Sequence, residues 1–131
     1  MTYQELYDSA LRIVSENDQG FANEDYEERA RYILATFCNT CSAIDAKYRK
    51  ANMYPSISYT PLSVVTLSGS FPLKEIFAPA AVYYLGAMLV SDENEELCDR
   101  LFELYTDAIS SIQDNLPCLS EPITNCYPEL N

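Results

Sequence analysis

Residues 76–90 read IFAPAAVYYLGAMLV, the longest apolar stretch of the chain. A helix formed by these residues is apolar nearly all round, as is typical of a helix enclosed by others in a protein core. The stretch is shorter than the roughly 20 residues that a membrane span needs, and acidic residues flank it. We therefore expect a buried central helix that Pro72 opens, with Pro79 either in its first turn or at a kink.

Amphipathic helices are predicted on both sides of this stretch. The first covers residues 2–16, where Thr2 and Glu5 have the spacing of a capping box and apolar residues recur at helical intervals. A longer helix is expected from a cap at Asn23 to about residue 50. The last helix is expected over residues 95–115, after an acidic turn.

The period changes between the second and third predicted helices. Ile57 and Tyr59 alternate with polar residues, Val65 and Leu67 do the same further on, and a proline-containing turn separates the two pairs. This pattern predicts two short strands. The predicted fold is therefore mainly α, a helical bundle of about four helices with a short two-stranded β ribbon between helices 2 and 3.

The chain of 131 residues has room for one domain of ordinary size. We expect a single helical domain over residues 1–116. Residues 117–131 hold three prolines and no periodic pattern, so they are expected to be an extended tail until a partner holds them.

The composition excludes several functions. The chain has no histidine, which rules out catalytic triads, Cys-His pairs and His-bearing zinc sites built from its own residues. Twenty acidic residues face eight basic ones, for a net charge of -12, and residues 91–131 contribute ten acids against Arg100 alone. Direct capture of DNA or RNA is not expected, because phosphate contacts require clustered Lys and Arg.

Two patterns carry a possible metal chemistry. Cys38 and Cys41 have the C-x-x-C spacing of half a zinc site or of a redox pair, but they fall inside a predicted helix and no second such pair follows. The acidic run at residues 92–96 lacks the central Gly and the twelfth-position Glu of an EF-hand loop. We favour buried thiols and a solvated helix start, and expect no catalytic residue, cofactor or metal.

The predicted last helix carries two neighbouring apolar stripes that together cover roughly 160° of its surface, more than one contact with a core requires. A two-stranded ribbon alone is also only marginally stable in water. Both features predict self-association. The candidate subunit interface consists of Phe102, Tyr105, Ile109, Val65 and Leu67.

The order of features over residues 71–112 is recognisable. A short extended piece is followed by the tyrosine-rich segment at 80–89, an acidic turn, and the residues LFELY at 101–105. This pattern resembles the small head-to-tail connector proteins, also called adaptor or head-completion proteins, of tailed bacteriophages and prophages. Residues 59–67 are similar to the β segment before this element in such proteins, and DYEERA at 25–30 is similar to the start of their long helix.

The resemblance implies a virion structural protein without enzymatic activity, made in the bacterial host cytoplasm and located at the head-tail junction. It would form a homo-oligomeric ring between the portal protein and the tail or stopper proteins, with no membrane contact, and DNA would pass through without specific binding. The absence of a secretory signal at the N-terminus agrees with this location.

The acidic residues have two interpretations within this framework. Carboxylates on a channel wall repel the phosphate backbone and let it slide, whereas carboxylates on the outer wall keep the particle in solution. The candidate acidic channel surface consists of Asp92, Glu93, Glu95, Glu96 and Asp99.

Two other classes of protein stay open at this point. The first alternative is an acidic regulator or inhibitor that presents its negative C-terminal half to a basic, nucleic-acid-binding partner. The second alternative is a cysteine-dependent metal or redox protein, which would need more of the five cysteines to converge on the Cys38 and Cys41 pair.

Overall fold

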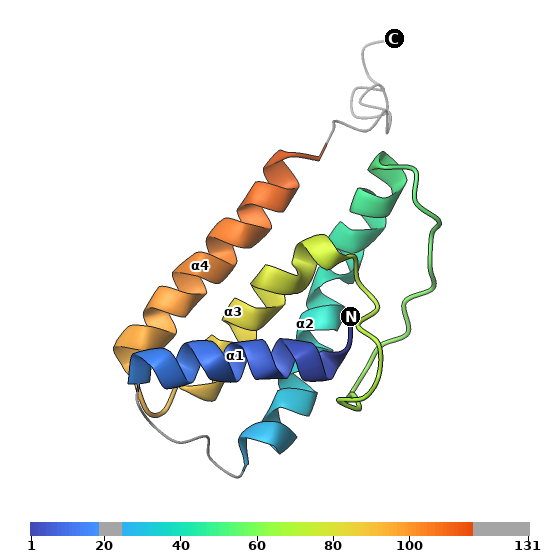
Figure 1. Ribbon diagram of the computed structural model, residues 1–131. Coiled ribbons are helices and arrows are strands. Elements are labelled where there is room, and N and C mark those ends of the chain that lie inside the picture. Colours follow the sequence, from blue (N-terminus) through green and yellow to red (C-terminus); the bar gives the residue numbers. More distant parts are fainter. Residues whose placement is uncertain (19–24, 117–131) are drawn as a thin grey trace, which may run out of the picture.

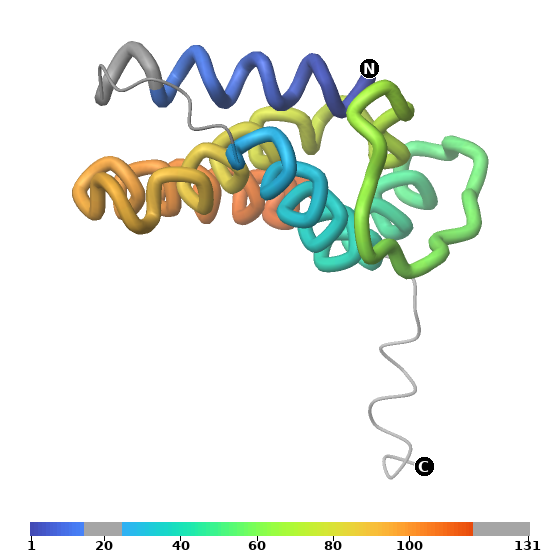
Figure 2. Tube along the Cα trace, turned by 90° about the horizontal axis from the view of Figure 1, so that it is seen from below, coloured from blue at the N-terminus to red at the C-terminus, as the bar shows by residue number. Residues whose placement is uncertain are grey.

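The computed structural model describes residues 1–18 and 25–116, and the mainly α prediction is confirmed for them. Three helices, α2, α3 and α4, lie side by side with α3 in the middle, and α1 crosses one face of this layer (Figures 1 and 2). The elements are α1 (Tyr3–Asp18), α2 (Tyr26–Ala51), the short 3-10 helix η1 (Glu75–Phe77), α3 (Ala78–Leu89) and α4 (Glu95–Asp114).

The apolar stretch at residues 76–90 contains the central helix, α3. Ala80, Leu85 and Leu89 of α3 are fully buried, and Pro79 lies in the first turn, where its missing N–H costs no hydrogen bond. A Cβ atom at Gly86 would stand 3.2 Å from Leu101 of α4, so glycine permits the close approach of these two helices. None of the helices in the described ranges combines the length and the apolar character that crossing a bilayer requires.

The helix ends follow local capping chemistry. The Thr2 hydroxyl accepts a hydrogen bond from the Glu5 N–H at 3.3 Å, and the Asn94 side chain accepts one from the Leu97 N–H at 3.0 Å. Both α1 and α4 begin at these caps, within one residue of the prediction. The predicted cap at Asn23 lies outside the described residues.

The third helix begins later than predicted. Pro72 was expected to open it, yet α3 begins at Ala78 after η1. The cause lies in α2, because Arg49 Nη2 donates to the Pro72 carbonyl at 2.9 Å and the Lys74 N–H donates to Asp45 Oδ1 at 2.9 Å. These bonds hold the main chain extended at Lys74 and delay the start of the helix.

Residues 52–74, here called the strap, differ from the prediction of two short strands. The predicted β ribbon is not found in this segment, which the structure describes throughout. Several of its hydrogen-bond partners belong to helices: Val65 exchanges two bonds with Arg31 of α2, at 3.2 and 2.9 Å, and the Leu67 carbonyl accepts from the Gln4 N–H of α1 at 2.8 Å. An isolated antiparallel bridge joins Ser70 of the strap to Thr2, just before α1. The strap therefore joins α1 to α2, and its two halves do not pair with each other.

Candidate functional site

Helix α4 packs on α3 and η1 through one side. Its side chains Leu97, Cys98, Leu101 and Ile112 are buried, whereas the neighbouring stripe is only partly covered. Three residues of that stripe define what we call the α4 flank: Phe102, Tyr105 and Ile109, all partly buried. The flank keeps apolar surface at the edge of the molecule.

The two rings of the α4 flank pack against aromatic side chains of α2 and α3. The Tyr84 ring of α3 lies 5.1 Å from the Tyr105 ring and 6.2 Å from the Phe102 ring, measured between centroids. The Phe37 ring of α2 lies 6.2 Å from that of Tyr105. These contacts fix the orientation of both rings.

The other two candidate interface residues lie elsewhere. Val65 is 5% exposed and Leu67 is 7% exposed, because the strap turns both side chains into the main core. They leave little surface for a second subunit. The structure thus brings Phe102, Tyr105 and Ile109 together on α4 and separates Val65 and Leu67 from them.

The five residues of the candidate acidic channel surface are all exposed and lie close together in the chain. Asp92 and Glu93 belong to the turn before α4, and Glu95, Glu96 and Asp99 belong to its first turns. Part of their role is local, since the positive end of the helix dipole favours acids there. The carboxylate of Glu93 also accepts a hydrogen bond from the hydroxyl of Tyr26 on α2.

Acidic residues continue along α4 beside the flank. Glu95, Asp99, Glu103 and Asp107 occupy successive positions four residues apart and are here called the acidic row. Like charges at this spacing destabilise a helix by about 0.2–0.5 kcal/mol a pair. The last three residues of the row line an open hollow of about 570 Å³ beside Phe102, so a negative surface borders the α4 flank.

The described cysteines, Cys38, Cys41 and Cys98, are buried free thiols, which confirms that interpretation for these three. Burial raises the pKa of Cys38 to about 11 and that of Cys41 to about 12, so the thiolate that attacks or binds metal is scarce at neutral pH. Among the residues described, no group of three His, Cys, Asp or Glu side chains is placed to hold a metal ion. Cys118 and Cys126 lie outside this part of the chain.

A buried ionic cluster that the sequence patterns did not predict lies between α2 and the strap. Asp45 is completely buried and accepts hydrogen bonds from Arg49 Nε at 2.8 Å and from the Tyr59 hydroxyl. We name these three residues the Asp45 cluster. The spacing of four between Asp45 and Arg49 on a predicted helix was a usable signal for the pair.

The Asp45 cluster fixes the strap on α2. Arg49 also donates to the carbonyls of Pro55 and Pro72, at 3.3 and 2.9 Å, so one guanidinium holds both ends of the strap. Burial raises the pKa of Tyr59 to about 12, and its hydrogen bond to Asp45 acts in the same direction. The phenol therefore stays protonated and continues to donate to Asp45.

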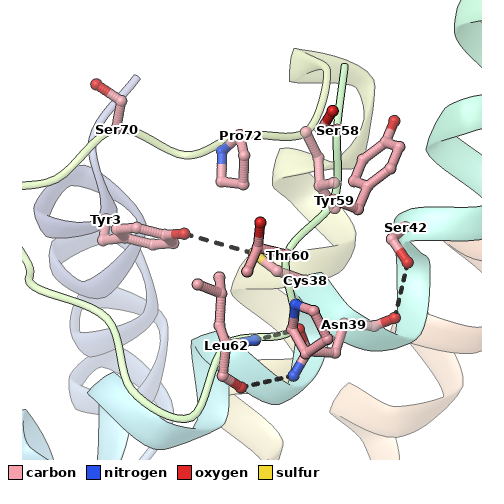
Figure 3. Close-up of a pocket in the computed structure, with 12 residues that line it drawn as sticks. Tyr3, Cys38, Asn39, Ser42, Ser58, Tyr59, Thr60, Leu62, Ser70 and Pro72 are labelled. Atoms are coloured by element: carbon pink, nitrogen blue, oxygen red, sulfur yellow. Dashed lines mark hydrogen bonds between the residues drawn. The ribbon is translucent and has the colours of Figure 1, made fainter. Parts of the chain in front are cut away.

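A cleft of about 450 Å³, here called the slot, lies between the strap and α2 (Figure 3). Its walls are strap residues 58–62 together with Ser70, Pro72 and Leu73, and its floor is formed by α2 and Tyr3. The Asn39 side chain exchanges two hydrogen bonds with the main chain of Leu62, at 2.7 and 2.9 Å, which fixes one wall. None of the residues that line the slot is charged.

No protein family, curated protein or solved structure was found to match this chain. Its function is therefore inferred from its own residues.

Proposed function

We propose that this chain is the structural subunit of a phage or prophage head-to-tail connector ring, which links the portal to the tail and forms part of the DNA exit channel. The observation that carries the proposal is the α4 flank. A ring needs a patch on each subunit that meets a different patch on the next copy. Two oriented aromatic rings and Ile109 at the edge of the molecule supply one such patch.

The chemistry of the α4 flank suits a subunit contact. Tyr and Phe are enriched in the centres of protein interfaces, and association orders few side chains when the rings are already held. Tyr84 and Phe37 hold them here. We therefore assign the flank, and not Val65 or Leu67, as the subunit contact of the proposed ring.

The charge of the chain supports the passage of DNA through this ring. Asp92, Glu93, Glu95, Glu96 and Asp99 are exposed at one end of α4, and Arg100 is the single base among residues 91–131. Carboxylates repel phosphates and do not retain them, so a wall of this kind leaves DNA free to slide. We propose this end of α4 as the surface nearest the channel.

Assembly of the full chain tests the proposal. We expect the chain to form closed rings, alone at high concentration or on a purified portal ring, visible by electron microscopy and by sedimentation. Ile109→Lys should prevent ring formation because it places a charge in the α4 flank. The matched control is Ser110→Lys, which adds the same charge at the exposed neighbouring position and should leave assembly intact. Equal assembly of both variants, or no assembly of the unmodified chain on a portal, would contradict the proposal.

The acidic row favours a second candidate, an acidic regulator or inhibitor of a basic, nucleic-acid-binding partner. Four carboxylates at successive spacings of four repel one another, and a basic surface would relieve that repulsion. For this candidate, the double variant Asp99→Asn, Glu103→Gln should weaken binding to a purified DNA-binding protein and reduce the salt dependence of that binding. In the ring proposal the same variant still assembles.

A further inference from the structure

We infer that the slot binds residues 123–127 from the C-terminal segment of a neighbouring copy, as an added strand beside the strap. The inference rests on the proposed ring and names the contact that links one subunit to the next. It starts from two features that the ring proposal does not use, namely the slot and the unpaired main chain next to it.

One wall of the slot offers free main-chain groups. In the part of the chain that the structure describes, the N–H and C=O groups of residues 56–60 make no hydrogen bond, whereas those of Leu62 and Val65 are paired with α2. Residues 56–60 run along the side of the molecule as an open stretch (Figure 2). Their side chains alternate as in a strand, with Ile57 and Tyr59 partly buried and Ser58 exposed. Such an edge is a template for an extended peptide.

The lining of the slot favours a peptide segment without charged side chains. Hydroxyl groups of Ser42, Ser58, Thr60 and Ser70 stand beside the apolar side chains of Leu62 and Leu73. This absence of charge contrasts with the net charge of -12 on the chain. Binding a charged side chain here would remove its hydration without supplying a counter-charge.

The chain itself contains a segment of matching chemistry. Fifteen residues follow Leu116, and within them ITNCY at residues 123–127 is the longest run without a charge or a proline. Ile, Thr and Tyr are residues that favour strands. Pro122 and Pro128 bound the run, so a strand formed there would contain five residues.

The donor is assigned to a neighbouring copy because of where the described chain ends. The segment leaves from α4, which lies across α3 from α2 and the strap (Figures 1 and 2). Six residues, 117–122, precede Ile123 and span at most about 20 Å when extended. A donor in the next subunit of a ring avoids the path around α2 and α3.

Cysteine cross-linking of the full chain tests this contact. Thr60→Cys places an exposed thiol in the slot, and Cys126 supplies the second thiol, in a Cys38→Ser, Cys118→Ser background that removes the thiol lining the slot and the other cysteine of residues 117–131. Oxidation of assembled rings with diamide should give covalent dimers and larger species, with residues 60 and 126 joined in one peptide by mass spectrometry. Ser68→Cys, exposed on the strap but outside the slot, is the matched control and should give none.

A second variant checks the strand geometry. The double variant Thr124→Pro, Asn125→Pro removes the main-chain N–H at two successive positions, so the added strand loses a hydrogen bond in either register. Rings of this variant should therefore yield no cross-link between residues 60 and 126. Ser120→Pro lies before the segment and should keep the link. Rings that form normally but show no 60–126 link would overturn this inference and leave the ring proposal standing. A link found only within one chain would also overturn it, because the donor would then be the subunit's own segment. Failure of the unmodified chain to form rings would remove the ring proposal itself.

Discussion

The strap and the α4 flank are held in opposite ways. The strap is fixed by hydrogen bonds to the buried carboxylate of Asp45, to Arg31 and to Arg49. Its apolar side chains Val65 and Leu67 are buried in the core. The flank is held by ring contacts and by non-directional packing against the core, and it keeps part of its apolar surface. In the proposed ring, the strap therefore preserves the fold of each subunit, and the flank forms the subunit contact.

The largest expected effect comes from breaking the Asp45 cluster. Asp45→Ala leaves the guanidinium of Arg49 without its buried counter-charge, so we expect the free energy of unfolding to fall by about 3–5 kcal/mol. Urea denaturation followed by circular dichroism measures the change. Asp107→Ala, an exposed acid of the acidic row, is the control and should stay within about 0.5 kcal/mol. If Asp45→Ala cost less than about 1 kcal/mol, the strap would not depend on this cluster.

The next effect concerns the same cluster at alkaline pH. The pKa of Tyr59 is raised from 10.0 to about 12 in the folded chain, so its protonated form stabilises the fold below pH 10 and that contribution is lost as the pH rises towards 12. Tyr59→Phe should lower stability by about 1 kcal/mol at neutral pH through loss of the hydrogen bond to Asp45. The gap between the two proteins should then close between pH 10 and 12. Parallel urea midpoints across that range would contradict the assignment.

The smallest expected effect is a gain in stability where the strap begins. Helix α2 ends in a Schellman motif, with hydrogen bonds from the Met53 N–H to the Lys50 carbonyl at 3.3 Å and from the Tyr54 N–H to the Arg49 carbonyl at 2.8 Å. Met53 has φ 61 and is 92% exposed, so its side chain adds strain without compensating contact. Met53→Gly should raise the free energy of unfolding by about 0.5–1 kcal/mol.

The control for this prediction lies one residue earlier. Asn52 has φ -103, where glycine gains no relief from strain, so Asn52→Gly should not stabilise the protein. A loss of stability in Met53→Gly would mean that the methionine side chain has a contact that its exposure does not reveal.

The two regions also differ in how far the sequence predicted them. The cap at Thr2, the acidic turn before residue 95 and the helical spacing of Phe102, Tyr105 and Ile109 are local signals, and the structure contains the helices that they predicted. The alternation of Val65 and Leu67 was interpreted as a strand because it shows which side chains are buried. It does not show what the main chain pairs with.

The strap could not be predicted because its partners are far away in sequence. Val65 pairs with Arg31, and Lys74 with Asp45, at separations of 34 and 29 residues. The same reason hides the slot, whose walls and floor come from three separate parts of the chain. The acidic residues are visible in the sequence, but their position relative to the proposed channel depends on the proposed assembly, which one chain does not contain.

Side-chain footprinting of the assembled ring tests the central claim most directly. Oxidative labelling of Phe102 and Tyr105 is compared between the free chain and the ring, with Tyr32, which is 52% exposed on α2, as the internal reference. If the α4 flank is the subunit contact, labelling of Phe102 and Tyr105 falls several-fold on assembly relative to Tyr32. Labelling of both residues that stays the same in the ring and in the free chain would contradict the account.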